Sequence, residues 1–289
     1  FLKRMKSLFN DFKFKVEDFD DILWANYSES NITKLWKASD TKDMFERRLS
    51  EGNKEYWKDK VIEYRYNNYG FRTDDDFNGY DEGVITLGCS FTEGIGLPIE
   101  YTWGYKIAKY LNTKHWNFGV GAMGLDTAFR YLVGASEKLK FNKVFLFVPP
   151  FYRNEFIIRD NELIKPYLTE GEKRDIVHTL GNRIDHNIFI NMIPEHEAFF
   201  KAMLFGSEKN EVLRMVRGLS AIKGLCEFLG IEFYYQTFSE YFNKETNEKA
   251  SLISDDICPD IPARDQHWNA KKQHLIYQRF IENYENNNR

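Results

Sequence analysis

The sequence predicts an α/β protein with three layers, in which helices cover both faces of a parallel sheet. Two observations support this prediction. Apolar segments of strand length alternate with segments of helical periodicity between residues 84 and 148. The first of these strand segments, Val84–Leu87, is nearly continuous in apolar residues, as expected of a strand that is covered on both faces. A strand–helix–strand–helix–strand rhythm of this kind is typical of parallel strands joined by helical crossovers.

Each strand of the predicted sheet ends at residues that interrupt a strand. Val84–Leu87 ends at Gly88, the segment 115–120 ends in a Gly-x-Gly turn, and the segment 143–148 ends at two prolines. Proline cannot donate to a ladder and glycine permits tight turns, so these residues mark the ends of the strands. A fourth strand is expected at 231–238.

Helices are expected between and after these strands, where apolar residues recur at helical spacing. The helix over 211–229 is followed by Gly230, a residue typical of the position after the end of a helix. The remaining predicted helices cover residues 102–111, 125–139 and 270–284.

Two further parts of the chain are expected outside this alternating pattern. Residues 1–62 are expected to form a mostly helical extension that packs on the main domain, which comprises residues 63–289. Ser39 and Asp40 are interpreted as the N-terminal cap of a helix within this extension. Residues 156–206 are of mixed character and are expected to form an insertion, mainly helical, that shapes the substrate cleft.

Composition excludes several classes of function. The formal net charge of −4 is unlike that of a general nucleic-acid binder, which is normally basic. The chain contains no apolar run of about 20 residues, so no transmembrane helix is predicted. The aromatic share of 17% indicates a core that is packed largely with rings. Because the first residue is Phe1, a removed signal or anchor is left open.

The cysteines and histidines indicate no metal site, and no cofactor is predicted. Cys89, Cys226 and Cys258 are far apart and give neither a disulfide framework nor a zinc spacing. This usage favours a reducing compartment and therefore the cytoplasm. The histidines of the predicted insertion are spaced by eight and ten residues, so no two share a helical turn; they are His178, His186 and His196.

A turn of small and polar residues, Gly88–Gly94, follows the first strand. Open α/β sheets place their ligands at the carboxyl ends of strands, where this turn is expected. Its glycines do not fit the dinucleotide pattern G-x-G-x-x-G, and it lacks the lysine of a phosphate-binding loop. Two interpretations are left: a nucleophilic Ser90 beside free N–H groups at the start of a helix, or a structural turn without chemistry.

A candidate base lies near the end of the chain. Asp265 precedes His267 by two residues, just before the last predicted helix. Asp265 can hold one ring nitrogen of His267, leaving the other nitrogen to accept a proton from Ser90. The alternative is an aspartate at a helix start beside a surface histidine.

Together these segments resemble the SGNH (GDSL-type) hydrolase family, whose fold is flavodoxin-like. Gly88–Gly94 resembles the first block of the family, Asn117–Gly124 the second and Asp265–Ala270 the last. Tyr66–Arg72 is similar to the N-x-x-G-F-R turn that often precedes the first block. The matched motifs cover a small part of the chain, but their order spans most of it.

The resemblance implies Ser90 as nucleophile, His267 as base and Asp265 as the residue that orients it. It also implies an oxyanion hole, which this chain would build from backbone N–H groups and one side chain. The candidate donors are the backbone of Ser90, the backbone of Gly121 or Ala122 in the second block, and the side chain of Asn154.

The family's usual aspartate after the first glycine is Cys89 here, which we interpret as filling a variable position rather than as the nucleophile. Arg153 and Trp268 are candidate substrate-binding residues. The resemblance implies a serine esterase or deacylase acting on a small-molecule or glycan acyl ester, with carbohydrate the natural class. Two alternatives stay open: an O-acyltransferase with the same triad, and an inactive binding module with the same fold.

Overall fold

The protein is built around a four-stranded parallel sheet. The computed structural model describes residues 29–50, 55–150, 153–158, 176–180, 208–237 and 258–288. The strands stand in the order β4-β3-β5-β8 and every pair is parallel. Their bounds are Lys114–Gly119 for β4, Glu82–Gly88 for β3, Lys140–Val148 for β5 and Glu232–Thr237 for β8.

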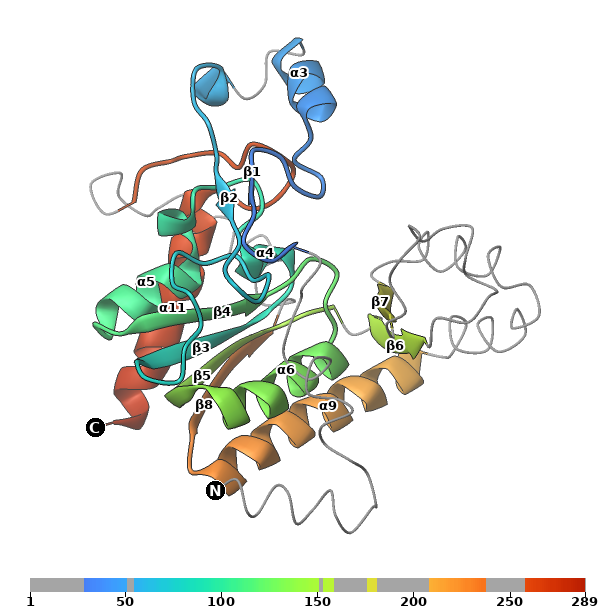
Figure 1. The fold of residues 1–289 in the computed structure, drawn as a ribbon, viewed down its shortest axis with the longest axis vertical. Helices are drawn as coiled ribbons and strands as arrows, with labels where there is room; N and C mark the ends of the chain where they lie inside the picture. The colour runs from blue at the N-terminus through green and yellow to red at the C-terminus, as the bar shows by residue number, and fades with distance from the viewer. Residues whose placement is uncertain are drawn as a thin grey trace, which may run out of the picture.

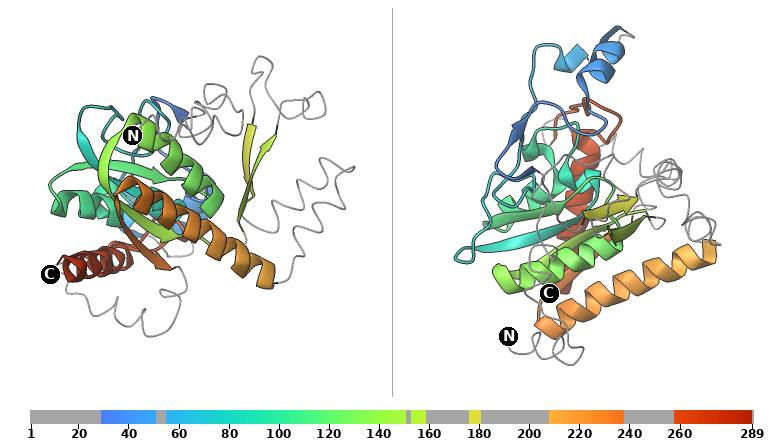
Figure 2. Two further views of the ribbon diagram at one scale, coloured as in Figure 1. Left: turned by 90° about the horizontal axis from the view of Figure 1, so that it is seen from below. Right: turned by 45° about the vertical axis from the view of Figure 1, so that its right-hand side comes forward.

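Helices cover both faces of this sheet, which confirms the predicted three-layer α/β architecture (Figure 1 and Figure 2). One face is covered by α6 (Leu125–Lys138) and α9 (Glu208–Leu229), and the other by α5 (Trp103–Tyr110) and α11 (Ala270–Asn287). Rings fill much of the core: Phe71, Trp116 and Phe118 lie on the α6 side, and Trp103, Phe145 and Phe280 lie on the α11 side. The described residues include no helix with the length and apolar character that crossing a bilayer requires.

The N-terminal segment lies over the carboxyl ends of the strands, beside the loop that precedes α11 (Figure 1). It contains β1 (Thr33–Lys34), which pairs with β2 (Tyr64–Arg65), and α3 (Lys42–Ser50). Residues 1–28 lie outside the described residues, so the predicted extension stays a prediction there. The N-terminal segment also contains the short turn η3 (Glu55–Trp57), whereas α4 (Ser90–Glu93) and η4 (Ile99–Tyr101) lie between β3 and α5.

The interpretation of Ser39 and Asp40 as a helix cap is wrong. The Thr41 hydroxyl accepts the hydrogen bond from the backbone N–H of Met44 at 3.3 Å, so Thr41 caps α3. The side chains of Ser39 and Asp40 instead contact the loop before α11. A serine or aspartate before a helix can cap that helix or bind a partner far away in the chain. The local sequence is the same in both cases, because the distant partner is known only from the fold.

The insertion expected over 156–206 forms a β-ribbon where it is described. Strand β6 (Asn154–Ile158) pairs antiparallel with β7 (Ile176–Leu180), so the expectation of helix is wrong for these strands. The β-branched Ile176, Val177 and Thr179 favour an extended backbone, which explains the difference. Residues 159–175 and 181–207 lie outside the described residues.

Candidate active site

Ser90 stands where β3 ends and α4 begins. The turn requires glycine at position 88, where φ is +151° and an added Cβ would lie 2.1 Å from Thr92 Oγ1. Cys89 is extended and Ser90 is the first residue of α4, so the chain reverses sharply at the end of the strand. This reversal leaves the Ser90 side chain 8% exposed at the carboxyl edge of the sheet.

The hydroxyl of Ser90, the imidazole of His267 and the carboxylate of Asp265 form one hydrogen-bonded chain. Ser90 Oγ lies 2.8 Å from His267 Nε2, and His267 Nδ1 lies 2.5 Å from Asp265 Oδ2. The backbone N–H of His267 also donates to Asp265 Oδ1 at 2.9 Å. The structure thus brings Ser90 together with Asp265 and His267, although His267 lies 177 residues further along the chain than Ser90.

Asp265 has the surroundings of a charged carboxylate. It is fully buried, and burial alone would raise its pKa. Hydrogen bonds from His267 and from the Ser39 hydroxyl, which lies 2.5 Å from Oδ2, outweigh this effect and lower the pKa of Asp265. An ionised carboxylate only accepts hydrogen bonds, so Nδ1 of His267 carries the hydrogen and Nε2 is free to accept the proton of Ser90.

Aromatic rings hold the imidazole in place. The ring of Phe91 lies 4.8 Å from that of His267 and 4.4 Å from that of Trp268. Trp268 also packs edge-on against Phe147, at 5.7 Å. Trp268 therefore contributes to the packing behind His267, and it is not among the described residues that line the cleft.

A cleft of about 700 Å³ opens beside Ser90 and His267. The N-terminal segment forms one wall, and the turn after β4 together with Arg153 forms another. Its described lining residues are Lys37, Ala38, Ser39, Ser90, Phe91, Val120, Gly121, Ala122, Arg153, Gln266 and His267.

The turn after β4 offers one of its two predicted N–H donors. The backbone N–H of Gly121 donates to Glu93 Oε2 at 2.6 Å, so it is not available to a substrate. Ala122 has a left-handed φ of +64°, which explains why the family resemblance places a glycine here. The backbone N–H groups of Ala122 and Ser90 have no acceptor among the described residues, as a site for a negatively charged oxygen requires.

Asn154 and Arg153 follow the end of β5. The backbone of Asn154 begins β6 and pairs with Leu180, whereas its side chain lies outside what the structure describes. Its role as an oxyanion donor stays a prediction. Arg153 lines the cleft, and its Nε and Nη1 atoms are buried without a hydrogen-bond partner.

The turn with the N-x-x-G-F-R pattern braces the segment that follows Ser90. Arg72 is 1% exposed and donates to the carbonyl oxygens of Glu93, at 3.2 Å, and Leu97, at 2.7 Å. Tyr66 donates to Glu93 Oε1 at 2.8 Å, and burial raises the pKa of Glu93. The residues of this turn therefore contact the backbone that follows Ser90.

No local sequence pattern predicts the contacts that the N-terminal segment makes with the loop before α11. Ser39 donates to Asp265 across 226 residues of chain, and the neighbouring Asp40 receives Arg264 Nε at 2.8 Å and Nη2 at 2.6 Å. Tyr64 also donates to Asp40, at 2.5 Å. Ser39 thus pairs with Asp265, and Asp40 pairs with Arg264. These partners are too far apart in the chain for a local sequence pattern to predict them.

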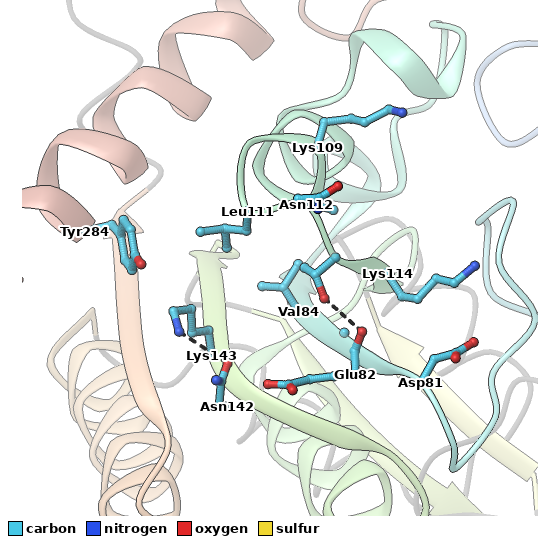
Figure 3. Close-up of a pocket in the computed structure, with 13 residues that line it drawn as sticks. Asp81, Glu82, Val84, Lys109, Leu111, Asn112, Lys114, Asn142, Lys143 and Tyr284 are labelled. Carbon is cyan, nitrogen blue, oxygen red and sulfur yellow. Dashed lines mark hydrogen bonds between the residues drawn. The ribbon is translucent and has the colours of Figure 1, made fainter.

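A second pocket, of about 670 Å³, lies at the opposite end of the sheet, where the strands begin (Figure 3). Two of its lysines are already paired with carboxylates: Lys143 lies 3.0 Å from Glu232, and Lys114 lies 2.8 Å from Asp75. The described part of the chain also holds no group of three or more His, Cys, Asp or Glu side chains that could bind a metal ion. The cleft beside Ser90 is therefore the candidate active site.

Comparison with known proteins gives a structural likeness only. No model of a protein family matches the sequence, and no curated protein matches it. The fold is similar to that of a candidate lipolytic protein of the G-D-S-L family from Desulfitobacterium hafniense DCB-2, with 13% sequence identity and a TM-score of 0.28. The match covers 70% of this chain and 97% of that chain. A likeness this distant decides nothing about chemistry.

Proposed function

We propose that the protein is a serine acyl hydrolase of the SGNH type, which removes an acyl group from an O-acylated substrate. The observation that carries this proposal is the distance of 2.8 Å from Ser90 Oγ to His267 Nε2, with the buried Asp265 behind the imidazole. A hydroxyl, a base and a group that orients the base, all beside a cleft, are the parts that nucleophilic acyl transfer needs. From the family resemblance, an acylated carbohydrate is the substrate class that we propose.

In the proposed reaction, His267 Nε2 takes the proton of Ser90 as the hydroxyl oxygen attacks the ester carbonyl carbon. Asp265 stabilises the imidazolium that forms. The oxygen of the tetrahedral intermediate becomes negative, and the N–H groups of Ser90 and Ala122 are the donors proposed to stabilise it. Collapse breaks the ester bond, and the leaving alcohol takes the proton from His267. Water then repeats the sequence on the acyl-enzyme, which releases the acid and regenerates Ser90.

Labelling with a fluorophosphonate tests this proposal directly. The reagent should attach to Ser90, because only an activated serine displaces fluoride from phosphorus at a useful rate. Mass spectrometry of the digested protein locates the label. Cys89 is the neighbouring candidate, and it is fully buried, so it should stay unmodified. Label on another residue, or none on an intact protein, contradicts the proposal.

We expect Ser39→Ala to reduce kcat/KM by roughly tenfold or more, because a hydrogen bond to a charged group contributes about 1.5–3 kcal/mol. In the wild type, this hydrogen bond also helps to lower the pKa of Asp265. Without it, Asp265 protonates at higher pH, so the acid limb of the pH profile of kcat/KM should move upward. A purely structural role would leave that limb in place.

The matched control for Ser39→Ala is Ser136→Ala. The Ser136 hydroxyl donates to the carbonyl oxygen of Val133 within α6, away from the cleft. Its removal should change neither kcat/KM nor the pH profile. If Ser39→Ala behaves like this control, the hydrogen bond to Asp265 has no positioning role.

A further inference from the structure

We propose that the substrate of this site carries a carboxylate group, which binds at Arg153 beside the scissile ester. This inference rests on the proposed function. The described residues that line the cleft include two cations, Lys37 and Arg153, and no aspartate or glutamate. The whole chain has a net charge of −4, so the positive lining is a local feature and not a general one. A cleft that is lined by charges of one sign raises the local concentration of ligands with the opposite charge.

Arg153 is the centre of this subsite. Its Nε and Nη1 atoms are buried and have no hydrogen-bond partner. Buried donors on a charged group are costly to leave unpaired, by about 1–3 kcal/mol or more. These two atoms have almost no exposed surface, so the proposed subsite requires the Arg153 side chain to turn toward an acceptor in the cleft. The planar guanidinium matches the planar carboxylate, which can accept two parallel hydrogen bonds.

The position of Arg153 is set by its backbone. An added Cβ at Gly124 would lie 2.7 Å from the carbonyl oxygen of Arg153, so the chain around Arg153 packs closely on the end of the turn that holds Ala122. Arg153 and Ala122 also line the same cleft, so a ligand at Arg153 shares that cleft with the proposed oxyanion site. We expect a carboxylate bound here to belong to the same molecule as the reacting ester.

Lys37 supplies positive potential from the opposite wall but already has a counter-ion. It pairs with Glu29, which also receives Lys34 at 2.7 Å. Two lysines share one carboxylate, so this cluster keeps a net positive charge. Among the described residues, Arg153 has no counter-ion, so both walls of the cleft contribute excess positive charge. A single carboxylate matches the guanidinium of Arg153 in charge and in planar shape.

Two matched pairs of esters test the inference. In the first pair, 4-acetoxybenzoate and its methyl ester, the charge is in the alcohol part. In the second pair, mono-4-nitrophenyl adipate and its methyl ester, the charge is in the acyl part. Selectivity is the kcat/KM of the anionic ester divided by that of its neutral partner, after subtraction of the enzyme-free rate. We expect Arg153→Gln to lower the selectivity of at least one pair by roughly ten- to a hundredfold.

The control variants remove a cation that does not line the cleft. Lys42→Gln removes an exposed lysine 3.7 Å from Glu46, and Arg65→Gln removes an exposed arginine 3.6 Å from Asp76. Both should keep the selectivity of the wild type. Lys37→Gln should lower it less than Arg153→Gln does. Unchanged selectivity in Arg153→Gln for both pairs overturns the inference, and so does an equal loss on charged and neutral esters, which would make Arg153 an oxyanion donor.

Failure of the proposed function gives a different result. If the wild type hydrolyses none of the four esters, we would measure binding of adipate and 4-hydroxybenzoate by calorimetry. Binding that Arg153→Gln abolishes supports a carboxylate subsite in a protein that does not hydrolyse esters. No binding in the wild type overturns the subsite together with the enzymatic proposal.

Discussion

Ser90→Ala should lower kcat for a short 4-nitrophenyl ester by roughly 10⁴- to 10⁶-fold. The substitution removes the only atom that forms the acyl-enzyme, while the donors around the proposed oxyanion stay in place. His267→Ala should cost about as much, because without the base the hydroxyl at 2.8 Å keeps its proton. The release of 4-nitrophenolate measures both effects.

The double variant is the sharper form of this experiment. Residues that act as one unit are not additive, so Ser90→Ala with His267→Ala should be no slower than either single variant. Circular dichroism should show intact folding in all three. Cys89→Ala serves as the control, since the thiol is buried and should retain most of the activity. Retention of a tenth of the wild-type rate in Ser90→Ala would end the enzymatic proposal and favour a binding module.

The central sheet and the positions of Ser90, His267 and Asp265 were predictable because they depend on local signals. A strand that ends at Gly88 and a helix that begins after Asn269 are visible in the sequence. In a parallel sheet, the segments that follow the strands gather at one edge, so a serine and a histidine placed after strands are expected to approach one another. Their approach to 2.8 Å agrees with that expectation.

The surroundings of these residues were not predictable, because they depend on partners far away in the chain. Gly121 looked like an oxyanion donor until the fold placed the Glu93 carboxylate 2.6 Å from its N–H. Trp268 looked like a substrate contact, but it packs on Phe91. Ser39 and Asp40 looked like a cap. In each case the residue type allows two uses, and only the tertiary contact selects between them.

Asp40→Ala should lower the free energy of unfolding by about 3–5 kcal/mol. Asp40 and Arg264 are 1% and 2% exposed and form a multiply hydrogen-bonded ion pair. Removal of the carboxylate leaves the buried Arg264 charge without its counter-ion and removes the acceptor of the Tyr64 hydroxyl. Urea unfolding, followed by far-ultraviolet circular dichroism, measures the loss.

Two further variants identify the cause. The exposed pair Lys42–Glu46 is the control, and Glu46→Ala should cost less than about 1 kcal/mol. Asp40→Leu combined with Arg264→Met should recover part of the loss, because it removes both charges at once. A cost for Asp40→Ala as small as that of Glu46→Ala would mean that the pair contributes little.

The size of this effect also tests where the folded unit begins. The sequence places a boundary at residue 62, which would make the segment around Asp40 an accessory extension. A loss of 3–5 kcal/mol in a single cooperative transition would instead place that segment in the same unit as the sheet. Arg264 directly precedes Asp265, so the same substitution should also lower kcat, by loosening the loop that positions Asp265 and His267. Loss of stability without loss of kcat in the folded fraction would confine the pair to a structural role.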